Sequence, residues 1–290
     1  YQIKDVAIHI SNYIKDLEIN LLIGGNNLEN DFKNLKNNKN HLIIGCPGRI
    51  NDMINRKLLD LSTVKLVIID EADELLSSGF KEQIYDIFKN FSNSIQLCLF
   101  SATITLALNE LIEKIMNDPI KIIVKNNQLT LDGIKQYFVK INDDNEKYDC
   151  LKDIFSKIVL SQTIIFCNSV KRVENLYNAM KDDEFPVTLI HSNLDKNQRT
   201  RNYNNFLSGK ERVLISSDIT ARGIDIQQVG IVINFDIPKL RETYIHRIGR
   251  SGRWGRKGKA INFITKKDIF NLKNIEEFYS TSITELPKDF

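Results

Sequence analysis

Short runs of apolar, mostly β-branched residues alternate with longer stretches at helical spacing along all 290 residues of the chain. This alternation is typical of parallel βα units, in which a crossover helix follows each strand. Several of the strand-like runs are apolar without interruption, so we expect those strands to be buried on both faces. The pattern therefore predicts an α/β fold with parallel sheets flanked by helices.

The same pattern predicts where the elements lie. The predicted strands are residues 21–23, 42–45, 66–69, 96–100, 120–124, 135–140, 163–166, 187–190, 213–216, 230–234 and 260–264. Helical spacing marks segments such as 81–90, 106–116, 171–180 and 199–207. Asn126-Asn127-Gln128 interrupts the periodicity and Gly133 ends that interruption. We therefore predict a first domain over 1–125, a linker over 126–133 and a second domain over 134–290.

Composition narrows the class of protein. With 42% hydrophobic and 27% charged residues, the chain is neither a disordered nor a membrane protein by composition. No apolar run approaches the roughly 18 residues that a spanning helix needs, so we expect no membrane insertion. Cys46, Cys98, Cys150 and Cys167 form no C-x-x-C pair, which favours a reducing intracellular location, cytoplasm or nucleus. The chain starts at Tyr1 without an initiator Met, so we expect it to begin part-way through a protein.

The net charge of +3 hides an uneven distribution. Between Lys239 and Lys259 there are eight basic residues and one acid, Glu242, which gives +7 and leaves −4 for the remainder. A single concentrated site of positive charge indicates a phosphate-bearing ligand rather than a generally basic surface.

An acidic cluster, Asp70-Glu71-Ala72-Asp73, directly follows the predicted strand 66–69. Ligands of open α/β sheets bind at this carboxyl end of the strands. In folds that hydrolyse phosphate esters, one such carboxylate reaches the water shell of Mg²⁺ and the next accepts a proton. The alternative is an ordinary helix N-terminus, capped by Asp70 and enriched in acids that favour the helix dipole.

Ser101-Ala102-Thr103 follows the next predicted strand and should lie beside the acidic cluster at the same sheet edge. The two hydroxyls could hydrogen-bond Asp73 and hold its position. Equally, this segment could be a Ser/Thr cap for the helix predicted over 106–116.

The segment from His246 to Gly258 has glycine at every third position from 249 and arginine at every third position from Arg247. Glycine keeps the backbone free of bulk, and guanidinium groups bind phosphate oxygens bidentately. As arginine fingers on a γ-phosphate, such residues raise rates by roughly 10³ to 10⁵. A solvated basic loop and a nonspecific nucleic-acid patch are the alternatives.

Further loops follow other predicted strands. Ser217 and Asp225 lie in a segment after strand 213–216, where Ser217 could meet an RNA phosphate and Asp225 a ribose hydroxyl. Gly24-Gly25 and Cys46-Pro47-Gly48-Arg49 offer open backbone N–H groups and a guanidinium that suit a sugar-phosphate strand. Ordinary turns and polar loops are the alternatives in each case.

Five motifs together resemble the series that defines DEAD-box RNA helicases, in that family's order. They are Asp-Glu-Ala-Asp at 70–73, Ser-Ala-Thr at 101–103, Ile-Phe-Cys-Asn at 165–168, Ala-Arg-Gly-Ile-Asp at 221–225 and His-Arg-Ile-Gly-Arg-Ser-Gly-Arg at 246–253. The resemblance covers essentially the whole chain. Segments 129–139 and 260–263 are similar to the translation initiation factor 4A subgroup, and 135–139 with 250–253 to its exon-junction and ribosome-biogenesis branch.

The resemblance implies two RecA-like domains, the first of them incomplete, with ATP between them and single-stranded RNA across both. By position, Asp70 would serve Mg²⁺, Glu71 would activate water, and Asp225 would hold the ribose. Asp73, Ser101, Thr103 and His246 would couple the domains, and Arg247 and Arg250 would reach the γ-phosphate. Gly25, Arg49, Asn168, Arg199 and Ser217 would lie along RNA phosphates. A scaffold protein of the MIF4G helical-repeat type would be a partner.

The chain departs from the family in lacking a Gly-Lys-Thr phosphate loop, because Gly209-Lys210 and Gly258-Lys259 continue with Glu and Ala. We therefore expect little ATPase activity from residues 1–290 alone. Two functions are compatible with the sequence. The first is an ATP-dependent RNA helicase that unwinds or clamps RNA. The second is a non-hydrolysing RNA- or protein-binding scaffold derived from that fold.

Overall fold

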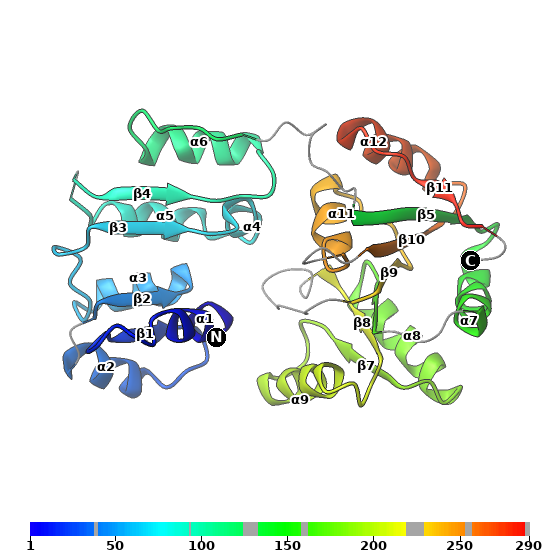
Figure 1. The fold of residues 1–290 in the computed structure, drawn as a ribbon, viewed down its shortest axis with the longest axis horizontal. Helices are drawn as coiled ribbons and strands as arrows, with labels where there is room; N and C mark the ends of the chain where they lie inside the picture. Colours follow the sequence, from blue (N-terminus) through cyan, green and yellow to red (C-terminus); the bar gives the residue numbers. More distant parts are fainter. Residues whose placement is uncertain are drawn as a thin grey trace. The chain divides into compact units, whose positions relative to one another are not determined.

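The computed structural model describes residues 1–37, 40–92, 94–123, 133–157, 162–218, 229–252 and 257–287. The chain forms two compact units, Tyr1–Lys121 and Ile122–Phe290 (Figure 1). Apart from Gly133, the predicted linker over 126–133 lies outside the described residues.

Unit 1 is built of βα repeats. Its elements are α1 (Gln2–Ile10), β1 (Ile19–Leu22), α2 (Leu28–Asn37), β2 (Leu42–Gly45), α3 (Pro47–Asn55), β3 (Leu66–Ile69), α4 (Ala72–Ser77), α5 (Lys81–Phe88), β4 (Gln96–Leu99) and α6 (Leu106–Ile115). β1 pairs with β2 and β3 pairs with β4, both in parallel. One face of β3 and β4 carries a buried apolar cluster that fixes α5 and α6 on that face. The cluster includes Ile69, Ile84, Leu108 and Leu111.

Two expectations for unit 1 are wrong. The strand predicted over 120–124 does not form over residues 120–123, and Val124 lies outside the described residues. Ile120 and Ile122 are 94% and 92% exposed, so this apolar run is not packed against a neighbouring strand. Burial on both faces also fails for β3, where Leu66 and Ile68 are 48% and 59% exposed while Ile69 is buried. In a two-stranded sheet with its helices on one side, alternate side chains face away from the core.

Unit 2 is a larger sheet sandwiched by helices. Its elements are β5 (Ile134–Lys140), the 3₁₀ turn η3 (Asp144–Glu146), α7 (Lys147–Lys157), β6 (Thr163–Phe166), α8 (Val170–Asp182), β7 (Val187–Ile190), α9 (Lys196–Leu207), β8 (Val213–Ser216), β9 (Ile231–Asn234), α11 (Arg241–Ile248), β10 (Gly258–Ile264), α12 (Ile269–Tyr279) and β11 (Thr284–Glu285). Seven parallel strands take the order β11-β5-β10-β9-β6-β8-β7.

The central strands of unit 2 are buried on both faces, as predicted. Every residue of β6, β7, β8 and β9 is buried. Ile165 and Ile215 belong to one apolar cluster, whereas Ile164 and Leu214 belong to another, because successive side chains of a strand point to opposite faces. Burying each such side chain contributes about 1.5–3 kcal/mol, so the two cores hold this sheet rigidly. The loops that leave β6, β8 and β9 therefore start from fixed, adjacent positions.

Candidate functional site

Two carboxylates lie where β3 ends in unit 1. Asp70 is exposed and Glu71 is half-buried, and Asp70 Oδ1 accepts the Glu71 backbone N–H at 2.9 Å. Glu71 has a left-handed backbone, with φ of 50° and ψ of 50°. For a residue with a Cβ this conformation costs about 1 kcal/mol or more, and such strain gathers at functional sites. Asp70 is not the cap of α4: the N-cap is Glu71, and its side chain makes no capping bond.

Thr103 and Ser101 hold the third acid, Asp73. Thr103 Oγ1 donates to Asp73 Oδ2 at 2.5 Å, and the Thr103 N–H donates to the same oxygen at 3.1 Å. Ser101 Oγ accepts the Asp73 N–H at 3.3 Å and donates to the Thr103 carbonyl at 2.8 Å. The predicted hydrogen bonds to Asp73 are therefore present. The capping alternative is wrong, because Thr105 caps α6 by accepting the Leu108 N–H.

The acidic pair has the chemistry that Mg²⁺ prefers. Magnesium takes hard oxygen ligands, keeps several waters, and is typically held by one or two carboxylates together with substrate phosphates. Asp70 and Glu71 provide two accessible carboxylates at one strand end, which fits that requirement. Across the part of the chain that the structure describes, no group of three or more His, Cys, Asp or Glu side chains could hold a metal by itself.

In unit 1, the predicted RNA loops are joined to each other by Arg49. Its guanidinium donates to Asp31 Oδ2 at 2.6 Å and to the Asn26 carbonyl at 3.1 Å. Asn26 follows Gly25, which is exposed and has a φ of 78° that glycine adopts without strain. Arg49 is 11% exposed at its side chain, so it holds the glycine loop in place while presenting little surface of its own.

Arg247 in unit 2 is completely buried, with a relative exposure of 0%. Its Nε donates to Asp218 Oδ1 at 2.5 Å, its NH1 group to the Asp236 carbonyl at 2.7 Å and to Asn234 Oδ1 at 3.2 Å, and its NH2 group to Asn168 Oδ1 at 2.7 Å. Since the guanidinium is enclosed within unit 2, this arrangement favours a positioning role over the γ-phosphate contact expected from the sequence.

Asn168 combines exposure with fixed geometry. It is an exposed residue two positions after β6, yet its backbone N–H donates to Asp236 Oδ2 at 3.1 Å and its Nδ2 donates to the Ile237 carbonyl at 2.8 Å. With Oδ1 accepting from Arg247, the side chain is held in one orientation. A polar group presented in this way is preorganised to contact a ligand.

The other predicted residues of unit 2 lie on separate elements, and Arg250 precedes Ser251, which pairs with Val229 just before β9 begins. Ser217 is buried directly after β8, Arg199 is half-buried on α9 and donates to the Leu194 carbonyl at 3.0 Å, and Arg250 Nε donates to the His246 carbonyl at 3.3 Å. Asp225 and the motif over 221–225 lie outside the described residues, as do positions 253–256 of the basic segment.

Sequence reasoning missed Asp218 and Asp236, which bind Arg247 and Asn168. Both follow a buried apolar strand of the sheet by only two residues, and this placement is the signal that could have identified them. Asp218 lies in the segment 217–225, where only Ser217 and Asp225 were given roles, and Asp236 lies in no segment that was singled out.

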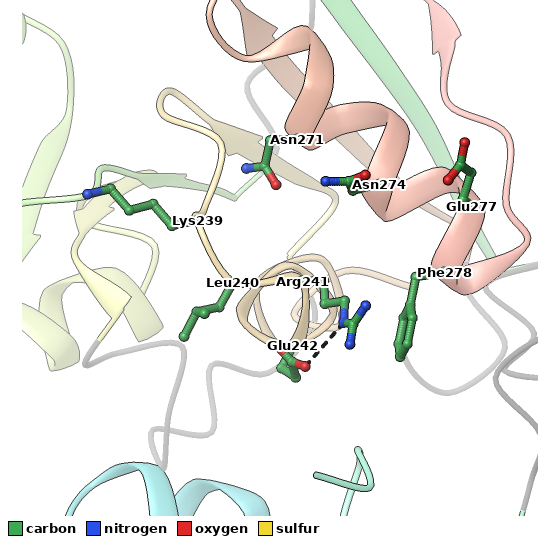
Figure 2. Close-up of a pocket in the computed structure, with 8 residues that line it drawn as sticks. All are labelled: Lys239, Leu240, Arg241, Glu242, Asn271, Asn274, Glu277 and Phe278. Atoms are coloured by element: carbon green, nitrogen blue, oxygen red, sulfur yellow. Dashed lines mark hydrogen bonds and ion pairs between the residues drawn. The ribbon is translucent and has the colours of Figure 1, made fainter. Parts of the chain in front are cut away.

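A separate hollow of about 610 Å³ lies between the start of α11 and the outer side of α12 (Figure 2). Arg241 faces Phe278, with its guanidinium carbon 3.5 Å from the ring centroid, and also approaches Glu242 at 3.4 Å. Asn271 and Asn274 line the side formed by α12, and Lys239 extends away from that helix. None of the predicted site residues lines this hollow.

The two units define a class of protein. One unit carries a carboxylate pair in which Glu71 has a strained backbone, and the other carries loops joined by Arg247. On parallel βα sheets, these features are typical of a nucleotide-driven enzyme with two RecA-like units.

Comparisons with known proteins identify the family. The DEAD/DEAH box helicase domain matches residues 1–111, and the helicase conserved C-terminal domain matches residues 146–255. The ATP-dependent RNA helicase eIF4A of Lodderomyces elongisporus is 47% identical over 288 residues, which cover 99% of this chain and 72% of that relative. Eukaryotic initiation factor 4A of Caenorhabditis elegans is 45% identical, covering 99% and 71%. The structure of S. cerevisiae Dbp5 bound to RNA and ADP BeF3 superposes with a TM-score of 0.87 at 31% identity, covering 99% of this chain and 74% of that one.

The chain belongs to the DEAD-box RNA helicases and is eIF4A-like. The predicted α/β fold with RecA-like units and the predicted ATP-dependent RNA helicase function are confirmed at this level. Among the described residues, no helix has the length and apolar character needed to cross a membrane.

Proposed function

We propose that this protein couples ATP hydrolysis to the binding and unwinding or clamping of single-stranded RNA, with Asp70 and Glu71 as its hydrolytic carboxylates. The observation that carries the proposal is the strained backbone of Glu71, which places two accessible carboxylates side by side at the end of β3. Strain of this kind persists only where the surroundings impose it, which favours a functional role over that of a chance surface pair.

In this proposal the two acids have different tasks. Mg²⁺ bound with ATP supplies charge neutralisation at the phosphates, and Asp70 would hold it through its water shell. Glu71 would orient the attacking water and accept its proton.

The remaining predicted residues have supporting roles. Asp73, held by Thr103 and Ser101, would transmit the state of the nucleotide site, and His246 would receive that signal in unit 2. Arg250 would contact the γ-phosphate, and Asp225 the ribose. Because hydrolysis then needs groups from both units, ATP and RNA would each favour the same closed state and strengthen the binding of the other.

RNA would be bound through its backbone, so that base sequence is not read. The residues proposed to lie along it are Gly25, Arg49, Asn168, Arg199 and Ser217. Fixed positions of the Gly25 loop and of Asn168 support this proposal, because preorganised groups lose little entropy on binding. On family resemblance alone, we also propose a helical-repeat protein partner of the MIF4G type.

Arg250→Ala in the product of the complete gene tests the assignment of the two units to one reaction. We expect RNA-stimulated ATP turnover to fall by about 10³-fold, the lower end for an arginine finger, with RNA affinity changed far less. Arg241→Ala is the matched control, since that side chain is 48% exposed and its guanidinium faces Phe278 on α12. Equal losses of turnover and RNA affinity in Arg250→Ala would overturn the assignment.

A further inference from the structure

Asp236 accepts hydrogen bonds from four other residues of unit 2. It lies two residues after β9 and is 8% exposed. Its Oδ1 accepts from Lys147 Nζ at 2.9 Å, and its Oδ2 accepts from Arg172 Nε at 2.7 Å and from the Asn168 backbone N–H at 3.1 Å. Both carboxylate oxygens are therefore engaged, one of them by the backbone of a proposed RNA contact.

The main chain of Asp236 closes a ring of hydrogen bonds. Its carbonyl accepts from the Arg247 NH1 group at 2.7 Å, and the NH2 group of the same guanidinium donates to Asn168 Oδ1 at 2.7 Å. The ring of Asp236, Asn168 and Arg247 joins the loops after β6 and β9 to α11. Displacing one member displaces the other two, because each hydrogen bond fixes the orientation of its partner.

The charge of Asp236 is balanced by two cations, Lys147 at Oδ1 and Arg172 at Oδ2. Lys147 is 4% exposed at its side chain and lies between Asp236 and Asp144, at 2.9 Å from each. Arg172 bridges the same two carboxylates. Asp144 is the outer member, 51% exposed at its side chain, and none of its described bonds reaches Asn168 or Arg247.

We propose that Asp236 is a positioning residue for RNA binding and for the motif on α11. It contacts neither RNA nor nucleotide, but its Oδ2 sets the Asn168 backbone and its carbonyl sets the Arg247 guanidinium. This inference rests on the proposed role of Asn168 in RNA binding. The loop after β9 thereby couples an RNA contact to the helix that carries His246 and leads to Arg250.

Asp236→Asn tests the proposal with little change in volume. An amide cannot accept at both positions, so its Nδ2 must face a donor, either Lys147 on one side or Arg172 and the Asn168 N–H on the other. Asp144→Asn is the matched control, because it removes an ion-pair partner of the same two cations, Lys147 and Arg172, and leaves the hydrogen bonds of the ring in place. Asp236→Glu is a second variant that keeps the charge and moves it by one methylene group.

Two measurements on residues 1–290 separate the possible outcomes. The first is the NMR chemical shift of the Asn168 backbone amide and of the Arg247 Nε–H group, which needs no ligand. The second is the affinity for a short oligouridylate by fluorescence anisotropy, with each variant's thermal midpoint recorded alongside. We expect Asp236→Asn to shift both resonances and weaken RNA binding by about tenfold, the effect of losing one charge-assisted hydrogen bond. Asp144→Asn should do neither.

Three results would decide against the inference. Resonances of Asn168 and Arg247 that move no further in Asp236→Asn than in Asp144→Asn would overturn the positioning role directly. Equal losses of RNA affinity in the two variants would also overturn it, because the loss would then come from the ion pairs with Lys147 and Arg172 and not from the ring. If Asp236→Asn fails to fold, the same measurements are made on Asp236→Glu. Unshifted resonances of Asn168 and Arg247 in that variant would contradict the proposal. Shifted resonances without any RNA binding by the unmodified chain would count against the RNA role of Asn168 rather than against the ring.

Discussion

Thr103 donates a hydrogen bond of 2.5 Å to the carboxylate of Asp73, which lies 30 positions earlier in the chain. Both residues are buried, at 7% and 6% exposure. The contact joins the loop after β4 to the first turn of α4, so the acidic cluster cannot move independently of its neighbouring strand.

Replacing Thr103 by Val removes this donor and keeps the side-chain shape. We expect the free energy of unfolding to fall by about 1–3 kcal/mol, because a buried carboxylate loses one of its hydrogen bonds. Thr103→Ser should recover most of the loss. Urea denaturation measures the effect, and a Val variant as stable as the unmodified protein would mean that the hydroxyl does not support Asp73.

Arg247→Ala leaves Asp218 and Asn168 without their common donor. We expect a loss of roughly 3–5 kcal/mol in unfolding free energy, the cost of breaking a buried charged network from one side. Arg247→Lys should not rescue it, since an ammonium group cannot reproduce a planar fork of donors. Arg241 is exposed, so Arg241→Ala serves as the control, and we expect it to change the free energy of unfolding by no more than about 0.5 kcal/mol. Similar, small losses in both alanine variants would contradict the buried geometry of Arg247.

Tyr244→Phe tests a polar chain that crosses the core of unit 2. The Tyr244 hydroxyl donates to Gln136 Oε1 at 2.8 Å and accepts from Asn262 Nδ2 at 3.3 Å, and burial raises the pKa of this phenol. Without the hydroxyl, Gln136 loses a buried donor, so we expect about 1–3 kcal/mol of destabilisation by urea denaturation. Tyr13→Phe, at a side chain that is 96% exposed, should change nothing measurable.

Asp144 gives the structure a pH-dependent contribution to stability. Hydrogen bonding from Arg172, and then from Lys147, lowers the pKa of this carboxyl below its ordinary value of 3.8. A lowered pKa in the folded state adds stability above the unfolded-state value, and this gain is lost as the pH falls through the folded-state value. Asp144→Asn should therefore be less stable than the unmodified protein at neutral pH and equally stable in strong acid. A difference that persists unchanged into acid would show that the charge of Asp144 is not its cause.

The sequence predicts several strands well because tertiary contacts agree with their local pattern. Runs 42–45, 66–69, 163–166, 187–190 and 213–216 form strands over those same residues, and their β-branched side chains suit pleated surfaces. The run at 120–124 has the same composition but no partner strand over its described residues, and local pattern cannot report whether a partner exists.

The candidate site is predictable only in part for a similar reason. Spacing groups Arg247 with Arg250, yet it cannot show that Arg247 is enclosed by Asn168 and Asp218, which lie 79 and 29 positions away. Asp236 escapes notice because its role depends on loops that meet only in the folded sheet. By contrast, the hydrogen bond between Thr103 and Asp73 follows from the expectation that neighbouring strands end at the same edge.

RNA-stimulated phosphate release by the product of the complete gene, compared with its Glu71→Gln variant, tests whether Glu71 activates the attacking water. Gln keeps the size of Glu71 but cannot accept a proton from water. We expect turnover that rises with single-stranded RNA and falls by at least about 10²-fold in Glu71→Gln, while RNA binding persists. We also expect little turnover by residues 1–290 alone. Turnover indifferent to RNA, or unchanged in Glu71→Gln, would contradict the account, and a complete product without turnover that still binds RNA would instead support a non-hydrolysing scaffold.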